Sequence, residues 1–242
     1  MRSGRRAGTG RVEQHPGATA GHDDSAVPGL HHELALARQG YRAIAGADEV
    51  GRGAWAGPLV AAAVVLPPVI DDEHAACLLA QLAGVRDSKL LSPARRAALC
   101  AAIVSTAVDV GVGWVAADEL DRLGLGAANR EALRRAVATL SVPADYLLLD
   151  AFPLPGVPLP QRAIVRGDRE CLSIAAASIV AKVARDRALV RLDGGYPAYG
   201  FARHKGYGTR DHQAAIFEHG PCPEHRLSFA PLRPHPPSPG EP

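Results

Sequence analysis

Apolar and polar positions divide the first half of the chain into short strands. Valine alternates with small or polar residues over 108–115, and short, mainly apolar runs occupy 41–48 and 59–66. Alternation with a period of two predicts a half-buried strand, and a short apolar run bounded by turn residues predicts a buried one. We therefore predict a strand in each of these three segments.

Helical spacing appears between and after these strands. Ser92 followed by Pro93 is typical of a helix start, because serine caps the first free N–H groups and proline fits the first turn. The sequence then predicts helices at 94–106, 117–123 and 127–140. In the last of these, apolar residues recur at spacings of three and four, which places them on one face.

Two later segments read as strands that each end in aspartate, at 146–150 and 163–168. A helix is predicted from 172 to 192, and three consecutive alanines at 175–177 would let it pack closely against its neighbour. Strands and helices thus alternate after an initial group of strands. This order predicts an α/β or α+β fold with a mixed sheet.

Composition predicts one domain with two tails. The 242 residues contain 47% hydrophobic residues, enough for one good core. Residues 1–30 lack periodicity and 231–242 are rich in proline, so we expect both to be disordered and the domain to span 31–230. No apolar signal region and no run of about 20 apolar residues is present. We expect a soluble, cytoplasmic monomer.

The four cysteines are scattered, as expected for free thiols in a reducing compartment. A zinc site formed by Cys222 and His225 with His204 or His212 is an alternative, although a second paired motif is missing.

The segment with the clearest chemistry begins at Asp48 and Glu49, which end the first apolar run. A charged pair at a strand tip needs compensation, and a divalent metal is the commonest. Gly51 and Gly53 would let main-chain N–H groups approach a phosphate or sugar, and Arg52 would supply a guanidinium for phosphate oxygens. A solvated turn is the simpler alternative. A dinucleotide-binding loop is excluded, because the sequence after these glycines predicts a strand, whereas that loop requires a helix there.

Asp150 and Asp168 add two more acidic strand ends. Each alone could belong to an ordinary turn, but three acidic strand ends in one domain favour a site for Mg²⁺ or Mn²⁺. Two such ions about 4 Å apart can stabilise the attacking and leaving oxygens of a phosphoryl displacement. Asp186 lies one helical turn after Lys182 and could be its ion-pair partner or support the site.

Only three of the 27 basic residues are lysines, namely Lys89, Lys182 and Lys205. In a chain that otherwise uses arginine, each surviving lysine stands in a motif-like segment. A compact ammonium group differs from a guanidinium where a single phosphate oxygen must be contacted. The lysines are therefore candidate phosphate contacts.

Six segments in order resemble bacterial ribonuclease HII, the type 2 ribonuclease H family, over about residues 41–230. They are DEVGRG at 48–53, AGP at 56–58, DSK at 87–89, AAASIVAK at 175–182 with Arg185 and Asp186 beyond it, YGFARHKGYGT at 199–209 and HRLSF at 225–229. Ala151 departs from the pattern, since the family often has glycine after this aspartate.

The resemblance implies a ribonuclease-H-like fold with surrounding helices and metal-dependent hydrolysis of the RNA strand of RNA–DNA hybrids. It also implies incision 5′ to a single ribonucleotide in duplex DNA, leaving 3′-OH and 5′-phosphate ends, with two Mn²⁺ or Mg²⁺ ions. The implied metal-binding and catalytic residues are Asp48, Glu49, Asp150 and Asp168. The implied substrate-binding residues are Gly51, Arg52, Gly53, Lys89, Lys182, Arg185, Lys205 and Tyr207.

Within that set, the backbone at 51–53 would contact the ribose 2′-OH and Tyr207 would pack on the sugar or base beside the scissile bond. Gly206 and Gly208 are expected to let residues 205–208, here called the tyrosine segment, approach a ligand closely. A non-catalytic hybrid-binding module and a DNA-junction nuclease of the same fold are the alternatives.

Overall fold

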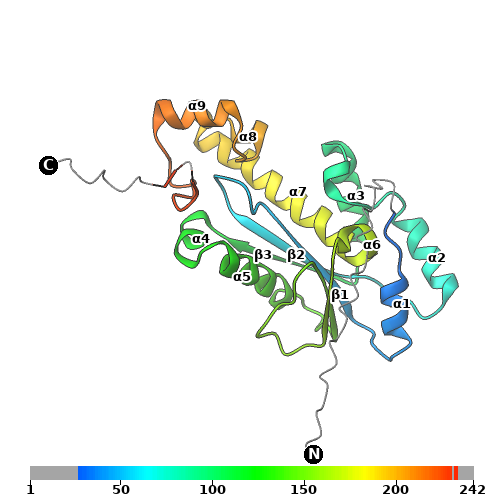
Figure 1. Ribbon diagram of the computed structural model, residues 1–242. Helices are drawn as coiled ribbons and strands as arrows, with labels where there is room; N and C mark the ends of the chain where they lie inside the picture. Colours follow the sequence, from blue (N-terminus) through cyan, green and yellow to red (C-terminus); the bar gives the residue numbers. More distant parts are fainter. Residues whose placement is uncertain (1–26, 231, 234–242) are drawn as a thin grey trace, which may run out of the picture.

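The computed structural model describes residues 27–230, 232 and 233, and its core is one mixed five-stranded sheet (Figure 1). The strand order is β3-β2-β1-β4-β5. The strands are β1 (Ile44–Val50), β2 (Leu59–Val65), β3 (Asp109–Val115), β4 (Tyr146–Asp150) and β5 (Gln161–Ile164). β1, β2 and β3 pair antiparallel, whereas β4 is parallel to both β1 and β5.

The parallel pairing of β1 and β4 brings distant acidic residues together. Ala47 pairs with Leu149, so the following residues on the two strands, Asp48 and Asp150, lie side by side. The sheet register therefore begins to build the site that the sequence predicts.

Helices surround the sheet, as the strand and helix pattern predicts. They are α1 (His31–Ala37), α2 (Asp72–Gln81), α3 (Pro93–Thr106), α4 (Ala117–Leu123), α5 (Leu125–Ala138), α6 (Gly167–Glu170), α7 (Leu172–Gly195), α8 (Phe201–His204) and α9 (Arg210–His219), with short 3₁₀ helices η1 (Ser88–Leu90) and η2 (Pro197–Tyr199). Ser92 caps α3 by accepting the Arg95 N–H, and Pro93 occupies its first turn, which confirms that predicted start.

The long helix α7 and helix α5 cover opposite faces of the sheet. Alternate residues of β2 show this division, because Ala62 and Val64 pack in the α7 core and Ala61 and Ala63 in the α5 core. A Cβ on Gly46 of β1 would lie 2.2 Å from the Ser173 carbonyl carbon. The start of α7 therefore lies directly on β1, which explains its run of alanines.

Several boundaries differ from the predictions. The predicted strand at 163–168 ends at Ile164, because Arg166 takes a left-handed conformation and Asp168 lies in α6. Asp48 and Glu49 lie inside β1 rather than at its end. Helices α1, α2 and α9 were not predicted.

The expected N-terminal tail is also shorter than predicted. Gly29 forms a β-bridge with Cys171, and Leu30 is buried, so residues 27–30 belong to the domain. Residues 1–26, 231 and 234–242 lie outside the described part. In the described residues, no helix is both long enough and apolar enough to cross a membrane.

Candidate active site

Four predicted carboxylates form an acidic cluster, defined as Asp48, Glu49, Asp150 and Asp168. Asp48 and Glu49 come from β1, Asp150 ends β4, and Asp168 lies in the first turn of α6. One oxygen of Asp150 accepts the Gly167 N–H at 2.8 Å, which fixes α6 against the end of β4. The fold therefore brings together residues that lie up to 120 positions apart in the sequence.

Burial and mutual repulsion perturb these acids. Burial, followed by the charges of Glu49 and Asp150, raises the pKa of Asp48 well above its ordinary value. Burial and the charges of Asp87 and Asp150 raise the pKa of Asp168. These shifts disfavour the charged form of the cluster, and a nearby cation would offset both causes.

The donor set fits divalent cations. It consists of carboxylate oxygens, the ligands that Mg²⁺ and Mn²⁺ prefer, and it carries more negative charge than its surroundings neutralise. In the described residues, three potential ligand atoms lie within 4.8 Å of one another only at His31, His32 and Glu170, so no three side chains of the acidic cluster come that close.

Polar side chains that were not predicted hold the cluster in place. Asp48 accepts hydrogen bonds from its neighbour's N–H and from Ser178 on α7. Asn129 on α5 donates to Glu49. Asp87 is buried beside the cluster, and its side chain caps η1 by accepting the Lys89 N–H at 3.0 Å. The DSK motif was the available signal for Asp87, whereas Asn129 carries none.

Lys89 is exposed beside the acidic cluster. Partial burial alone would lower the pKa of Lys89, but the charges of Asp87, Asp168, Asp48 and Asp150 together raise it. The neighbouring carboxylates therefore favour the protonated ammonium form of Lys89.

A loop of residues 51–58, here called the glycine loop, follows β1 directly. Arg52 on this loop pairs with Glu49 at 3.3 Å and is otherwise exposed. Gly53 is exposed, and a Cβ there would meet nothing within 4 Å. This part of the loop is open to solvent, and the predicted main-chain contact with a ligand stays a prediction.

Two buried arginines hold the glycine loop from beneath, and we call Arg185 and Arg226 the arginine pair. Arg185 donates to the carbonyls of Pro58 at 2.9 Å and Ala56 at 3.0 Å, and also to that of Lys205. Arg226 donates to Gly57 and Gly51. Both side chains are fully buried.

These contacts revise the role of Arg185, which was predicted to contact phosphate directly. Its three guanidinium nitrogens are occupied by backbone carbonyls, and its side chain is not exposed. Arg185 therefore positions the loop. Arg226 was not predicted at all, although it lies in the recognised HRLSF segment.

The glycines near the arginine pair also serve the protein's own packing. A Cβ on Gly51, whose φ is +96°, would lie 2.3 Å from Arg185 Nε. A Cβ on Gly206 would lie 2.3 Å from the Ala56 carbonyl oxygen, and one on Gly208 would enter the Trp55 ring. The expectation that Gly206 and Gly208 serve ligand approach is thus corrected, because Trp55 and Ala56 occupy that space.

The alternative zinc site is replaced by a hydrogen-bonded histidine network. The Nε2 atoms of His212 and His225 lie 3.1 Å apart. His212 Nδ1 hydrogen bonds to the Tyr207 carbonyl, and His225 Nδ1 accepts the Cys222 N–H. The ring nitrogens of His212 and His225 are therefore already used within the protein. All four cysteines are free.

Comparison with known proteins identifies the family. The ribonuclease HII family model matches residues 45–232. Ribonuclease HII of Roseiflexus castenholzii is 54% identical over 205 residues, covering 85% of this chain and 89% of the relative. The corresponding protein of Syntrophotalea carbinolica is 50% identical, covering 86% and 94%. This chain belongs to the ribonuclease HII family.

Solved structures agree with that assignment. The crystal structure of ribonuclease H2 from Pyrococcus horikoshii OT3 superposes with a TM-score of 0.63 at 27% identity, covering 78% of this chain and 95% of that one. The chain is therefore an endoribonuclease of the ribonuclease H type, with activity on RNA–DNA hybrids, and its fold is ribonuclease-H-like.

The remaining predicted residues of this ribonuclease HII surround Tyr207, which is half-buried. The Lys182 ammonium lies 5.7 Å from the centre of its ring and the Arg185 guanidinium 5.4 Å. Lys182 also pairs with Asp186 at 2.7 Å, so Asp186 is indeed its ion-pair partner. Lys205 is half-buried, and its ammonium donates to the Ala202 carbonyl.

Proposed function

We propose that this ribonuclease HII incises 5′ to a single ribonucleotide in duplex DNA, leaving 3′-OH and 5′-phosphate ends, and also cleaves longer RNA–DNA hybrids. The observation that carries the proposal is the acidic cluster placed directly before a rigidly held glycine loop. Buried and half-buried carboxylates that repel one another have little structural value without a cation, which argues against a non-catalytic hybrid-binding module.

The acidic cluster supplies the metal ligands. Asp48, Glu49, Asp150 and Asp168 would hold two Mg²⁺ or Mn²⁺ ions, with Asp48 and Asp150 side by side across the β1–β4 pairing. When bound, such ions lower the pKa of a water nucleophile and stabilise the negative charge on the leaving oxygen. The protein contributes the fixed positions of these oxygens, through the sheet and the Gly167 N–H.

The glycine loop and Tyr207 provide selectivity for RNA. Arg52 and Gly53 are exposed next to Glu49, so their main-chain groups can reach the sugar of a strand bound at the acidic cluster. The ribose 2′-OH is the group that distinguishes RNA from DNA there. Trp55 and Ala56 N–H groups both donate to the Gly206 carbonyl, which fixes the tyrosine segment to the same loop. A DNA-junction nuclease would not require this arrangement.

Positive side chains beside the cluster would bind the strand backbone. Lys89 is exposed and adjacent to the carboxylates, Lys182 lies 5.7 Å from the centre of the Tyr207 ring, and Lys205 precedes Tyr207 by two residues. Each lysine can neutralise a phosphate. The contribution of Lys182 to phosphate binding is smaller, because Asp186 already pairs with its ammonium group.

A gel assay tests the function directly. An all-DNA duplex is compared with the same duplex carrying one ribonucleotide, first in Mg²⁺ and then in Mn²⁺. We expect one incision, 5′ to the ribonucleotide, and none in the all-DNA duplex. Cleavage of a long hybrid without any incision at the single ribonucleotide would reject the finer specificity while leaving ribonuclease H activity in place.

Tyr207→Ala tests the selectivity assignment in the same assay. A single embedded ribonucleotide offers one cleavage position, whereas a long hybrid offers many. We therefore expect the variant to lose far more activity on the single ribonucleotide. Equal losses on both substrates would assign Tyr207 a general structural role.

A further inference from the structure

A basic groove lies beside the tyrosine segment, between α3, α7 and α8. It encloses a cavity of about 570 Å³. Its basic side chains are Arg96, Lys182, Arg187, Arg191, Arg203 and Lys205. Asp186 is the only acidic residue in its lining, so the groove carries a strong positive potential.

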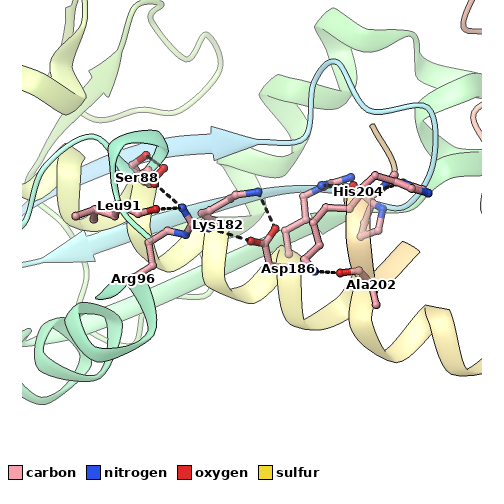
Figure 2. Close-up of polar contacts among 12 residues, drawn as sticks. Ser88, Leu91, Arg96, Lys182, Asp186, Ala202 and His204 are labelled. Atoms are coloured by element: carbon pink, nitrogen blue, oxygen red, sulfur yellow. Dashed lines mark hydrogen bonds and ion pairs between the residues drawn. The ribbon is translucent and has the colours of Figure 1, made fainter. Parts of the chain in front are cut away.

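The inner wall of the groove is built rigidly. Arg96 is buried and donates to the carbonyls of Ser88 at 2.8 Å and Leu91 at 2.6 Å. Figure 2 shows Arg96 and Lys182 both directed at Asp186, at 3.6 and 2.7 Å. The single acid of the groove is therefore used in holding α3 against α7.

The outer basic residues are free to bind a ligand. Arg187 and Arg191 are exposed, and neither has an ion-pair partner in the part of the chain that the structure describes. Arg203 pairs with Asp211 at 3.6 Å, but both side chains are largely exposed, so this pair contributes little. The groove thus presents unneutralised cations to solvent.

Hydrogen bonds connect the groove to the candidate active site. Arg96 of the groove donates to the Ser88 carbonyl, the Ser88 hydroxyl hydrogen bonds to Ser178 at 3.1 Å, and Ser178 in turn hydrogen bonds to Asp48. Lys182 lies over the Tyr207 ring. A strand bound at the acidic cluster could therefore continue into the groove.

The length of α7 gives the distance between Ser178, beside the acidic cluster, and the exposed arginines of the groove. An α-helix rises 1.5 Å per residue, so Arg187 lies about 13 Å and Arg191 about 20 Å along the axis from Ser178. Phosphates of one duplex strand advance about 3.4 Å per base pair along the axis. For a duplex that lies along α7, the two arginines therefore correspond to about four to six base pairs from the cleavage point.

We propose that the basic groove binds the phosphodiester backbone of the substrate about four to six base pairs away from the scissile bond. This inference rests on the proposed function, because it takes the acidic cluster as the cleavage point. Cations spread along α7 match a chain of phosphates, whereas a single small anion would use only one or two of them.

The test combines arm length with substitution. Duplexes with one ribonucleotide carry 12-base-pair arms on both sides, or a 3-base-pair arm on one side or the other. Affinity is measured by fluorescence anisotropy in EDTA, which prevents cleavage, across a series of salt concentrations. Three proteins are compared: the wild type, the double variant Arg187→Ala/Arg191→Ala, and the control Arg130→Ala. Arg130 is an exposed arginine on α5, which packs on the opposite face of the sheet from α7.

We expect the double variant to lower the salt slope by about two on the long duplex, because two phosphate contacts are lost. Shortening one of the two arms should lower the wild-type slope to that of the variant and remove the difference between them. Arg130→Ala should match the wild type throughout.

Lys89→Ala separates the groove from the cleavage point. This lysine lies beside the acidic cluster, so its loss should lower the slope by about one with long and short arms alike. A double variant that retains the wild-type slope on the long duplex, or an effect that persists when either arm is shortened, would overturn the groove assignment. Absence of incision in Mg²⁺ and Mn²⁺ would instead count against the proposed function.

Discussion

Two groups of like charge adjoin one short stretch of chain, β1 with the glycine loop after it, and their hydrogen bonding differs. The acidic cluster places four carboxylates together, and burial raises the pKa of Asp48, Asp150 and Asp168. The arginine pair buries two guanidinium groups, and burial lowers the pKa of Arg226 to about 9. Both arrangements are costly, because an isolated buried charge loses its hydration.

The arginine pair is satisfied from within the protein. Arg185 and Arg226 direct all their guanidinium nitrogens at backbone carbonyls of the glycine loop and of Lys205. Carboxylate oxygens cannot be satisfied in this way by one another, since none is a donor when ionised. The arginine pair, whose hydrogen bonds are complete, thus supports a loop, whereas the acidic cluster keeps acceptor capacity that a bound cation would use.

The largest test of this distinction is Asp150→Asn. The change keeps the side chain's shape and its acceptor oxygen for the Gly167 N–H but removes a charge from the acidic cluster. We expect cleavage to fall on the order of 10³-fold, as several kcal/mol of metal-dependent stabilisation is lost. Duplex binding should change little, because no phosphate contact is removed.

Asp168→Asn sharpens the same test. Asp168 lies on the short helix α6 rather than on a strand, and we expect its loss to weaken one ion whose binding excess metal partly restores. Cleavage is followed over a Mn²⁺ titration. If the Asp150 variant cleaves at nearly the wild-type rate, Asp150 is not a metal ligand. If the Asp168 variant is inactive at every Mn²⁺ concentration, the expectation that its loss is less severe than that of Asp150 is wrong.

Arg226→Met tests the other group. Methionine fills similar space but leaves the Gly57 carbonyl without a donor and the Gly51 carbonyl with only the Ala54 N–H. We therefore expect a loss of about 3 kcal/mol in the free energy of unfolding. Arg226→Lys retains the charge without the planar fork and should lose less. Urea unfolding gives both values, and KM for the ribonucleotide duplex should rise in step.

An equally stable or more stable Met variant would contradict the comparison. It would show that burying the charge costs more than its hydrogen bonds return, as happens in some proteins with buried ion pairs. The arginine pair would then serve substrate binding at the expense of stability, rather than holding the loop.

The sequence predicted the acidic cluster far better than the arginine pair, for a physical reason. Aspartates at strand ends stand out against apolar runs, and the parallel pairing of β1 with β4 then brings Asp48 and Asp150 together. Arg185 and Arg226 are two among many arginines, and nothing local distinguishes a buried guanidinium from a solvated one. Their role depends on carbonyl positions that only the folded loop defines.

Other errors have the same origin. Residues 163–168 have strand-like composition, but the left-handed Arg166 ends β5 and turns Asp168 into α6. The network of His212 and His225 depends on a 3.1 Å contact between segments 13 residues apart, which spacing alone does not reveal.

The pH dependence of stability tests whether the tyrosine segment, like the arginine pair, is held by hydrogen bonds within the protein. His212 provides the test, because it hydrogen bonds to the Tyr207 carbonyl. Burial lowers the pKa of His212 from 6.5 to about 4, with smaller effects of the charges on His204 and His225. Between these pH values the unfolded chain binds a proton that the folded protein excludes. The contribution of His212 to stability is therefore fully present above pH 6.5, and up to about 3 kcal/mol of it is lost toward pH 4.

His212→Asn isolates this contribution, because the carboxylates of the acidic cluster also titrate in acid. Asparagine can still donate to the Tyr207 carbonyl but does not ionise. The free energy of unfolding is measured from pH 7.5 to 4 for both proteins. The variant should lose less stability over this range, and parallel curves would show that His212 is protonated equally in both states.

The smallest expected effect concerns the backbone beside each group. Around the arginine pair, most residues with positive φ are glycines, namely Gly51, Gly57 and Gly206, and Lys205 is the exception. Beside the acidic cluster, in contrast, Ala151 has a φ of +59°. A left-handed conformation costs a residue with a Cβ about 1–2 kcal/mol, and glycine loses part of that advantage through its greater freedom in the unfolded chain.

Ala151→Gly should therefore stabilise the protein by about 0.5–1 kcal/mol, measured by urea unfolding. Ala98→Gly is the matched control. Ala98 is exposed in the interior of α3, where glycine is unfavourable, so the same chemical change should destabilise by about 1 kcal/mol. Opposite signs would place backbone strain directly after Asp150, at the acidic cluster and not at the loop held by the arginine pair. Destabilisation by both changes would show that the turn after Asp150 relaxes without cost.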